Sequence, residues 1–217
     1  VIMREKLLVR LSAIFIFSFF PAVQGFTQNP ECILPIATND LSLVTGGQQY
    51  DGAGHIGIDF KLYTDGVGII APCGGVVTEV MKKPNPKNNH SMWSINIKYS
   101  TDWNIFIVFE PDTPCPPDVE RQQQQIFVSL NQVVTKGQIL GKLVVRDPSI
   151  CDPSVTDWYP HIHWSIYRNN LATTHVCPAD YLTAEAKVAL NNLYGSFGLL
   201  PVCLGYPPAP PSGLRII

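Results

Sequence analysis

The five histidines of this 217-residue chain are unevenly distributed, because three of them fall into two short motifs. One motif is a His-x-x-x-Asp pair, His55 and Asp59, and the other is a His-x-His pair, His161 and His163. Zinc accepts imidazole nitrogens and carboxylate oxygens, and a catalytic zinc site uses three protein ligands and leaves the fourth position open. The four groups are one more than such a site requires. The remaining histidine would take the proton of an activated water or stabilise a developing oxyanion.

Strand geometry explains how each motif would present its polar side chains together. Side chains alternate between the two faces of a strand, so His161 and His163 point one way and the isoleucine between them points the other way. An extended segment would likewise place His55 and Asp59 on one face and the isoleucines between them on the other. One isolated histidine on a strand is usually an ordinary, partly exposed residue, but the two motifs together predict a metal site.

The elements that must carry these motifs are mostly strands. Short segments rich in β-branched and aromatic residues are separated by Gly, Pro or Asn, a pattern typical of strands joined by turns. The best amphipathic helix is Ala179–Tyr194, with Thr183 as its N-cap. The predicted class is therefore mainly antiparallel β with one C-terminal helix. The predicted strands are Val67–Ala71, Gly75–Met81, Trp93–Tyr99, Ile105–Phe109, Ile139–Val145 and His161–Tyr167.

Two long loops and a proline-rich end complete this organisation. The loops are predicted at Lys82–His90 and at Glu110–Gln125, which carries four prolines and four consecutive glutamines. Loops of this length tend to be functional or flexible, and these two would form walls of a groove. Residues 201–217 read as a proline-rich tail that is extended on the surface.

The first 25 residues have the layout of a secretory signal peptide. A charged start is followed by the apolar run Leu11–Phe20 and by small and turn residues. This run is about half the length of roughly 20 residues that a membrane span needs. We therefore expect a secreted or periplasmic protein with no stable membrane span after cleavage, and one domain over residues 26–200.

Charge argues against a nucleic-acid partner. Removing residues 1–25 removes Arg4, Lys6 and Arg10 together with Glu5, which changes the formal net charge from −2 to −4. A nucleic-acid-binding domain is usually basic.

The six cysteines all follow the signal segment and contain no Cys-x-x-Cys pair. An even number of cysteines in an exported chain predicts disulfides, and their scattered spacing argues against a cysteine zinc site. Sequence does not determine the pairing. Position along the chain suggests Cys73 with Cys115, and Cys177 with Cys203 across the predicted helix.

Four segments follow one another in an order that resembles a known family. They are Gly54–Asp59, Ala71–Val80, Lys136–Lys142 and His161–His163. Together they resemble the lysostaphin-type zinc peptidases, the M23 family. The resemblance implies an antiparallel, sandwich-like β fold of the duplicated hybrid motif type, with a substrate groove.

The resemblance also implies roles for individual residues. Zn²⁺ would bind His55, Asp59 and His163, and His161 would be the catalytic histidine. The substrate would be peptides in peptidoglycan or another extracellular peptide.

The chain departs from the family pattern at one position. Active members usually carry a further histidine in a Tyr-x-His-Leu-like segment at a strand end, whereas Ile105–Asp112 contains none. Losing one donor to a developing oxyanion typically lowers the rate by roughly 10²- to 10³-fold. Glu110 and His90 are the candidates to replace it, although His90 in its polar loop reads more simply as an exposed residue and Glu110 equally as an ordinary surface carboxylate.

Two hypotheses follow from the motifs. The first is a secreted zinc metalloendopeptidase that hydrolyses peptide bonds in peptidoglycan, with His161 as general base or oxyanion stabiliser. The alternative is a catalytically impaired, zinc-containing protein that binds a peptide, glycan or protein partner. The missing histidine favours the alternative, and the presence of His161 favours the enzyme.

Overall fold

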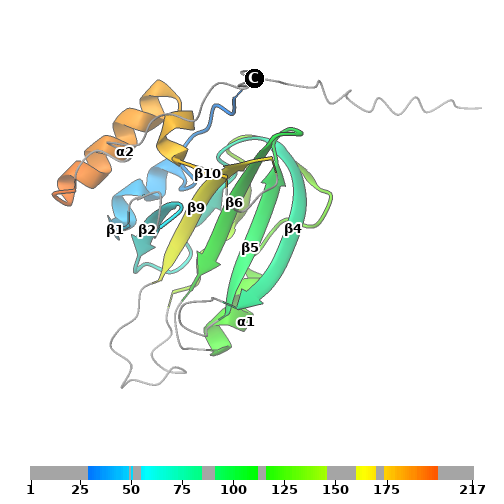
Figure 1. Ribbon diagram of the computed structural model, residues 1–217. Coiled ribbons are helices and arrows are strands. Elements are labelled where there is room, and N and C mark those ends of the chain that lie inside the picture. Colours follow the sequence, from blue (N-terminus) through cyan, green and yellow to red (C-terminus); the bar gives the residue numbers. More distant parts are fainter. Residues whose placement is uncertain are drawn as a thin grey trace, which may run out of the picture.

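An antiparallel sheet forms the centre of the computed structural model, which describes residues 29–48, 50, 55–84, 91–111, 116–145, 160–169 and 174–199 (Figure 1). Its strands are β1 (Val44–Gly46), β2 (Ile58–Leu62), β4 (Gly75–Pro84), β5 (Ser91–Lys98), β6 (Trp103–Glu110), β7 (Val133–Val134), β9 (His161–Arg168) and β10 (His175–Val176). Within the described residues the order is β1-β2-β9-β6-β5-β4-β7, and β10 also pairs with β9. All these pairings are antiparallel.

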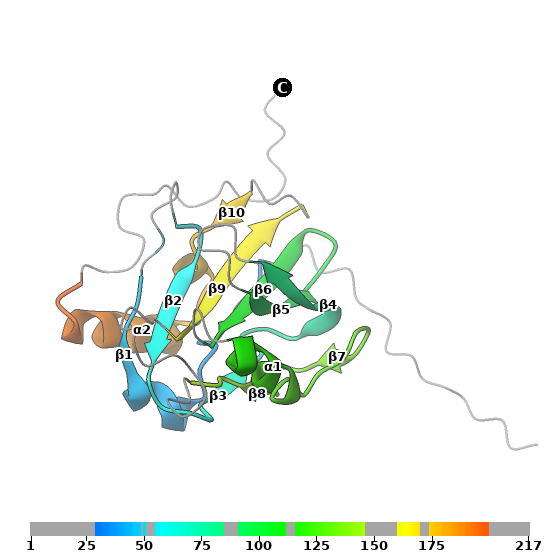
Figure 2. The same ribbon diagram turned by 90° about the horizontal axis from the view of Figure 1, so that it is seen from below.

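Smaller elements surround this sheet. A second sheet pairs β3 (Gly68–Ile70) with β8 (Ile139–Lys142), and Figure 2 shows it beside α1 (Pro116–Gln124). The helix α2 (Ala184–Ser196) lies on the side of β1 and β2 in both views. Two 3₁₀ helices, η1 (Thr38–Leu43) and η2 (Pro178–Tyr181), precede β1 and α2.

Alternation along β9 separates the core from a polar face. Ile162, Trp164 and Ile166 are fully buried, while His161 and His163 are partly buried on the opposite face. On β2, Ile58, Phe60 and Leu62 are fully buried on the core side. Burial of these large apolar side chains on one face fixes which face each histidine takes, because a shift by one residue would exchange the two faces.

The structure confirms the mainly antiparallel β class and contains a strand within each of the six predicted segments. The strand β2 was not among the predicted strands. Within α2, Thr183 is the N-cap, since its side chain accepts a hydrogen bond from the Ala186 N–H at 3.2 Å. The helix begins after this cap and not at Ala179, which lies in the buried η2.

Both predicted loops contain regular structure. Lys82 and Pro84 belong to β4, which extends further than predicted because it pairs with β5 along its whole length. The segment predicted as a loop at Glu110–Gln125 contains the end of β6 and the helix α1. This helix begins at Pro116, where a proline is tolerated because the first turn lacks internal N–H bonds. The predicted C-terminal helix is present as α2, and α1 is an additional helix that the sequence did not predict.

The disulfide prediction is partly wrong. Cys73 bonds to Cys32 and not to Cys115, because Cys32 lies beside it at a Cα–Cα distance of 4.8 Å. Cys177 is also disulfide-bonded. The predicted signal segment and proline-rich tail, Cys115 and Cys203 lie outside the described residues. No helix in the described part of the chain is both long and apolar enough to cross a bilayer.

Candidate metal centre

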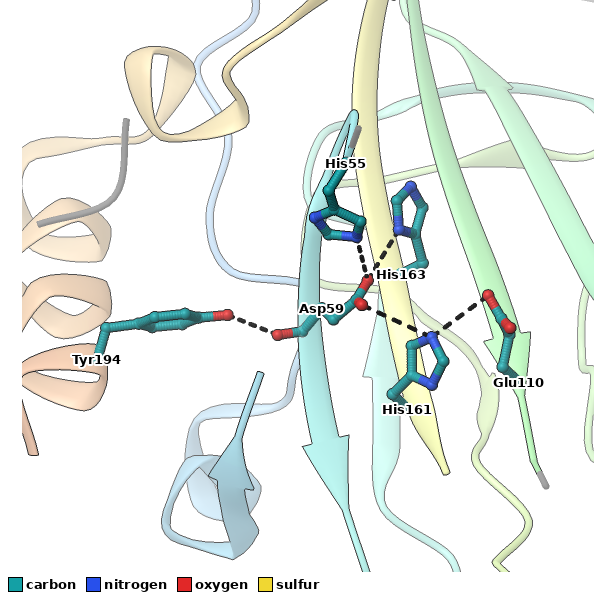
Figure 3. Close-up of polar contacts among 6 residues, drawn as sticks. All are labelled: His55, Asp59, Glu110, His161, His163 and Tyr194. Carbon is teal, nitrogen blue, oxygen red and sulfur yellow. Dashed lines mark hydrogen bonds and ion pairs between the residues drawn. The ribbon is translucent and has the colours of Figure 1, made fainter. Parts of the chain in front are cut away.

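The pairing of β2 with β9 brings the two histidine motifs together (Figure 3). Asp59 on β2 lies directly opposite His163 on β9 in the antiparallel register. His55 precedes β2 by three residues, and its side chain returns to the same carboxylate. His55 and Asp59 are both buried, with 7% and 4% exposed. Residues that are 104 positions apart in sequence thus share one small site.

Three side chains converge closely and have the chemistry of metal ligands. His55 Nε2 lies 3.0 Å from Asp59 Oδ1, and His163 Nδ1 lies 2.8 Å from the same oxygen. The ligand atoms of these three residues all lie within 4.8 Å of one another. Tetrahedral zinc with bonds of roughly 2.0–2.2 Å separates its ligand atoms by roughly 3.3–3.6 Å. Small side-chain movements would therefore let His55, Asp59 and His163 hold a zinc ion.

His161 lies beside this group, with different neighbours. Its Nε2 is 3.8 Å from Asp59 Oδ2 and 3.3 Å from Glu110 Oε1. Glu110 ends β6 directly opposite His161, and both side chains are largely buried, at 12% and 13% exposed. Figure 3 shows the His161 ring between the two carboxylates. This histidine can therefore hold or transfer a proton next to the three candidate ligands.

The Asp59 carboxylate is kept ionised by its surroundings. Burial by itself would raise the pKa of Asp59. Hydrogen bonds with His163 and His55, together with the charges of His161 and His163, outweigh that effect and hold the pKa well below the usual value of 3.8. An ionised carboxylate is the form that binds a metal ion.

Two neighbours outside the motifs hold the site in place. The buried phenol of Tyr194 on α2 donates a 2.5 Å hydrogen bond to the backbone carbonyl of Asp59. Gly57 passes so close to the His163 ring that a Cβ there would lie 2.5 Å from His163 Nε2. Both are long-range contacts without a local pattern, and sequence reasoning did not identify either.

Some of the other residues predicted at the site lie where they were expected, and others do not. Glu110 lies at the site, whereas His90 lies outside the described residues. Of the two isoleucines expected on a shared apolar face, Ile58 is fully buried but Ile56 is 39% exposed. The reason is that β2 begins only at Ile58, so the strict alternation of a strand does not extend back to Ile56.

Comparison with known proteins gives matches among solved structures. No family model matches the chain, and no curated protein matches it. The peptidase lysostaphin from Staphylococcus simulans is 17% identical with a TM-score of 0.46, over 83% of this chain and 61% of that one. A mutant catalytic domain of the M23 protein EnpA from Enterococcus faecalis is 19% identical with a TM-score of 0.40, over 69% and 94%.

A zinc-containing peptidase from Vibrio cholerae is 17% identical with a TM-score of 0.37, and the match covers 69% of this chain but only 35% of that protein. The solved structures similar to this chain thus include M23 peptidases. This is the family that the sequence motifs resemble.

Proposed function

We propose that this protein is an exported zinc metallopeptidase. The observation that carries the proposal is the convergence of His55 Nε2 and His163 Nδ1 on one oxygen of Asp59, with the His161–Glu110 pair next to it. Three ligands with an adjacent proton-transfer group fit a catalytic zinc site better than a structural site, which is usually closed by four protein ligands.

The residues divide the chemistry between them. Zinc held by His55, Asp59 and His163 would polarise the scissile carbonyl and make water a better nucleophile. His161 takes the proton from the attacking water and returns it to the leaving amine. A protonated His161 ring also donates a hydrogen bond to the oxygen that becomes negative.

Glu110 supports this chemistry through His161. An ionised carboxylate accepts hydrogen bonds and donates none, so Glu110 does not supply the oxyanion donor that the missing histidine would give. Its negative charge, 3.3 Å from His161 Nε2, stabilises the protonated ring and fixes its orientation. Glu110 is thus a positioning residue, and His161 is the group that contacts the substrate.

The substrate is an extracellular peptide. Peptidoglycan peptides are the first to test, because the motifs resemble those of the lysostaphin-type peptidases. The second candidate function is a zinc-containing binding protein, which is favoured by the absence of any histidine from β6.

The test measures bound zinc and hydrolysis in the same preparations. Wild-type protein, His55→Ala and His161→Ala would be compared on purified peptidoglycan and on a peptide library. We expect about one zinc per wild-type chain, loss of zinc and cleavage in His55→Ala, and bound zinc without cleavage in His161→Ala. Zinc in both wild type and His161→Ala with no cleavage of any substrate would reject the peptidase and favour the binding protein.

A further inference from the structure

A pocket of about 240 Å³ opens next to the candidate metal centre, and its function does not follow from the metal ligands alone. It is lined by His163 together with Ile56, Lys83, Phe106, Ser165, Tyr167 and His175. Because His163 belongs both to the pocket wall and to the candidate ligands, a group in the pocket would lie beside the bond being cut.

Aromatic rings form one wall of this pocket. Phe106 and Tyr167 meet edge to face with their centroids 6.5 Å apart, and Tyr167 and His175 are 5.5 Å apart. These rings come from β6, β9 and β10, three neighbouring strands of the sheet. Ile56, which is 39% exposed, adds an aliphatic surface. Such a wall attracts a large apolar or aromatic side chain.

The charged group in the lining is neutralised locally. Lys83 Nζ pairs with Glu79 Oε1 at 2.5 Å and lies 5.3 Å from the centre of the Phe106 ring. An acidic ligand would have to compete with Glu79 for this ammonium group. The pocket therefore does not favour a carboxylate.

Two polar atoms of the lining residues are closed off from the pocket. Among the described residues, Ser165 Oγ and His175 Nδ1 lack a hydrogen-bond partner but have almost no accessible surface, so neither offers a polar contact to a ligand. The volume is below that of typical pockets for drug-sized ligands, roughly 300–1,000 Å³, and therefore suits one side chain.

We propose that this pocket is a specificity site that binds a large, uncharged aromatic or aliphatic side chain of the substrate next to the scissile bond. This inference rests on the proposed peptidase function and narrows its substrate class. Peptides that would place glycine or an acidic residue in this pocket are expected to be poor substrates, and so is any peptidoglycan peptide without a large apolar residue beside the scissile bond.

The experiment uses the full zinc-loaded protein and internally quenched peptides that are identical except at one position. That position would be Phe, Leu, Ala, Gly, Asp or Lys, scanned on either side of the cleavage site. We expect kcat/KM for the Phe and Leu peptides to exceed that for Gly by on the order of 10- to 100-fold. Equal values for all peptides, or a preference for Asp, would overturn the inference.

Substitutions in the pocket test whether the preference for Phe over Gly comes from these lining residues. Phe106→Ala should reduce the Phe-to-Gly ratio to within about threefold, because a truncated ring leaves less apolar surface to bury. Phe127→Ala is the matched control, because this phenylalanine is 50% exposed and is not among the pocket-lining residues. Ile56→Ala is a second pocket variant in case Phe106→Ala folds poorly. A ratio that stays unchanged in both pocket variants would overturn the inference.

Binding measurements separate this inference from the proposed activity. Fluorescence anisotropy would give Kd for the same Phe and Gly peptides with zinc-loaded wild type, Phe106→Ala and Phe127→Ala. If no substrate is cleaved, the peptidase proposal fails. The pocket is still supported if the Phe peptide binds about tenfold more tightly than the Gly peptide and loses this advantage only in Phe106→Ala, and it is rejected if both peptides bind equally.

Discussion

The phenol of Tyr194 donates a 2.5 Å hydrogen bond to the backbone carbonyl of Asp59, and both groups are buried. This bond connects α2, near the C-terminal end of the described chain, to the strand that carries a candidate metal ligand. The Tyr194 ring also meets Phe60 edge to face, with centroids 6.3 Å apart. The helix therefore fixes the position of Asp59 from the side opposite the carboxylate.

Tyr194→Phe tests this connection. The substitution keeps the ring packing and removes one hydrogen bond, so we expect a loss of about 1 kcal/mol in the free energy of unfolding. Zinc affinity should fall by roughly 10-fold, because Asp59 is less well oriented. Chemical denaturation and competition with a chromophoric chelator measure the two effects. Tyr63→Phe, at a 41% exposed site, is the control, and equal zinc affinity in both variants would contradict the role of Tyr194.

Gly57→Ala should disturb the metal centre sterically. The added Cβ would lie 2.5 Å from His163 Nε2 and 2.6 Å from the Trp164 carbonyl oxygen, so the His163 ring must move. We expect a cost of about 1–3 kcal/mol in stability and a clear loss of zinc binding. Calorimetric zinc titration measures the latter. Gly195→Ala in α2 is the matched substitution, because nothing lies within 4 Å of its added Cβ and alanine favours helix.

Glu110→Gln should impair turnover without releasing the metal. The amide keeps the shape of the side chain but no longer stabilises a protonated His161, so we expect kcat to fall by on the order of 10²-fold. The limb of the pH–rate profile that reports protonation of His161 should move to lower pH, a shift that a purely structural defect would not cause. Glu120→Gln on the exposed side of α1 serves as the control. An unchanged profile would remove Glu110 from the mechanism.

Acid should weaken the metal-free protein through Asp59. The pKa of Asp59 is lowered in the folded state, so its contribution to stability is complete above the unfolded value near 3.8 and decreases as the pH falls below that value. The difference in unfolding free energy between wild type and Asp59→Asn should be largest at pH 5–7, roughly one unit or more above that value, and shrink toward pH 3. Urea denaturation at several pH values measures it. A difference that does not change with pH would show that Asp59 is not held ionised by its histidines.

The predictions from sequence were most accurate where alternation within one strand determines which face of the sheet each side chain takes. Alternation in His161-Ile162-His163 correctly separated a buried face from a polar face, because strand geometry alone decides it. The six predicted strand segments were also confirmed, because β-branched and aromatic residues between turn residues favour strands. Glu110 was one of two candidates, together with His90, and the pairing of β6 with β9 was needed to place it opposite His161.

The features that sequence missed depend on contacts between distant segments. In the sequence, nothing distinguishes Tyr194 from the other residues of an amphipathic helix. Its phenol has a hydrogen-bond partner only because α2 packs against β2. The pairing of Cys73 with Cys32 depends in the same way on the path of the chain between them. The helix α1 was missed because its prolines and glutamines read as a loop, although its first proline stands at a position where helices accept it.

Asp59 and His163 are 104 residues apart along the chain, and each comes from a strand with a neighbour on both sides. The three candidate ligands meet only in molecules in which β2 is paired with β9. This pairing requires that most of the chain between the two strands has been synthesised and folded. A chain with mispaired strands would lack the third ligand. Under the proposed zinc-binding function, the fraction of molecules that take up zinc would therefore measure how much of a preparation is correctly folded, before any substrate is known.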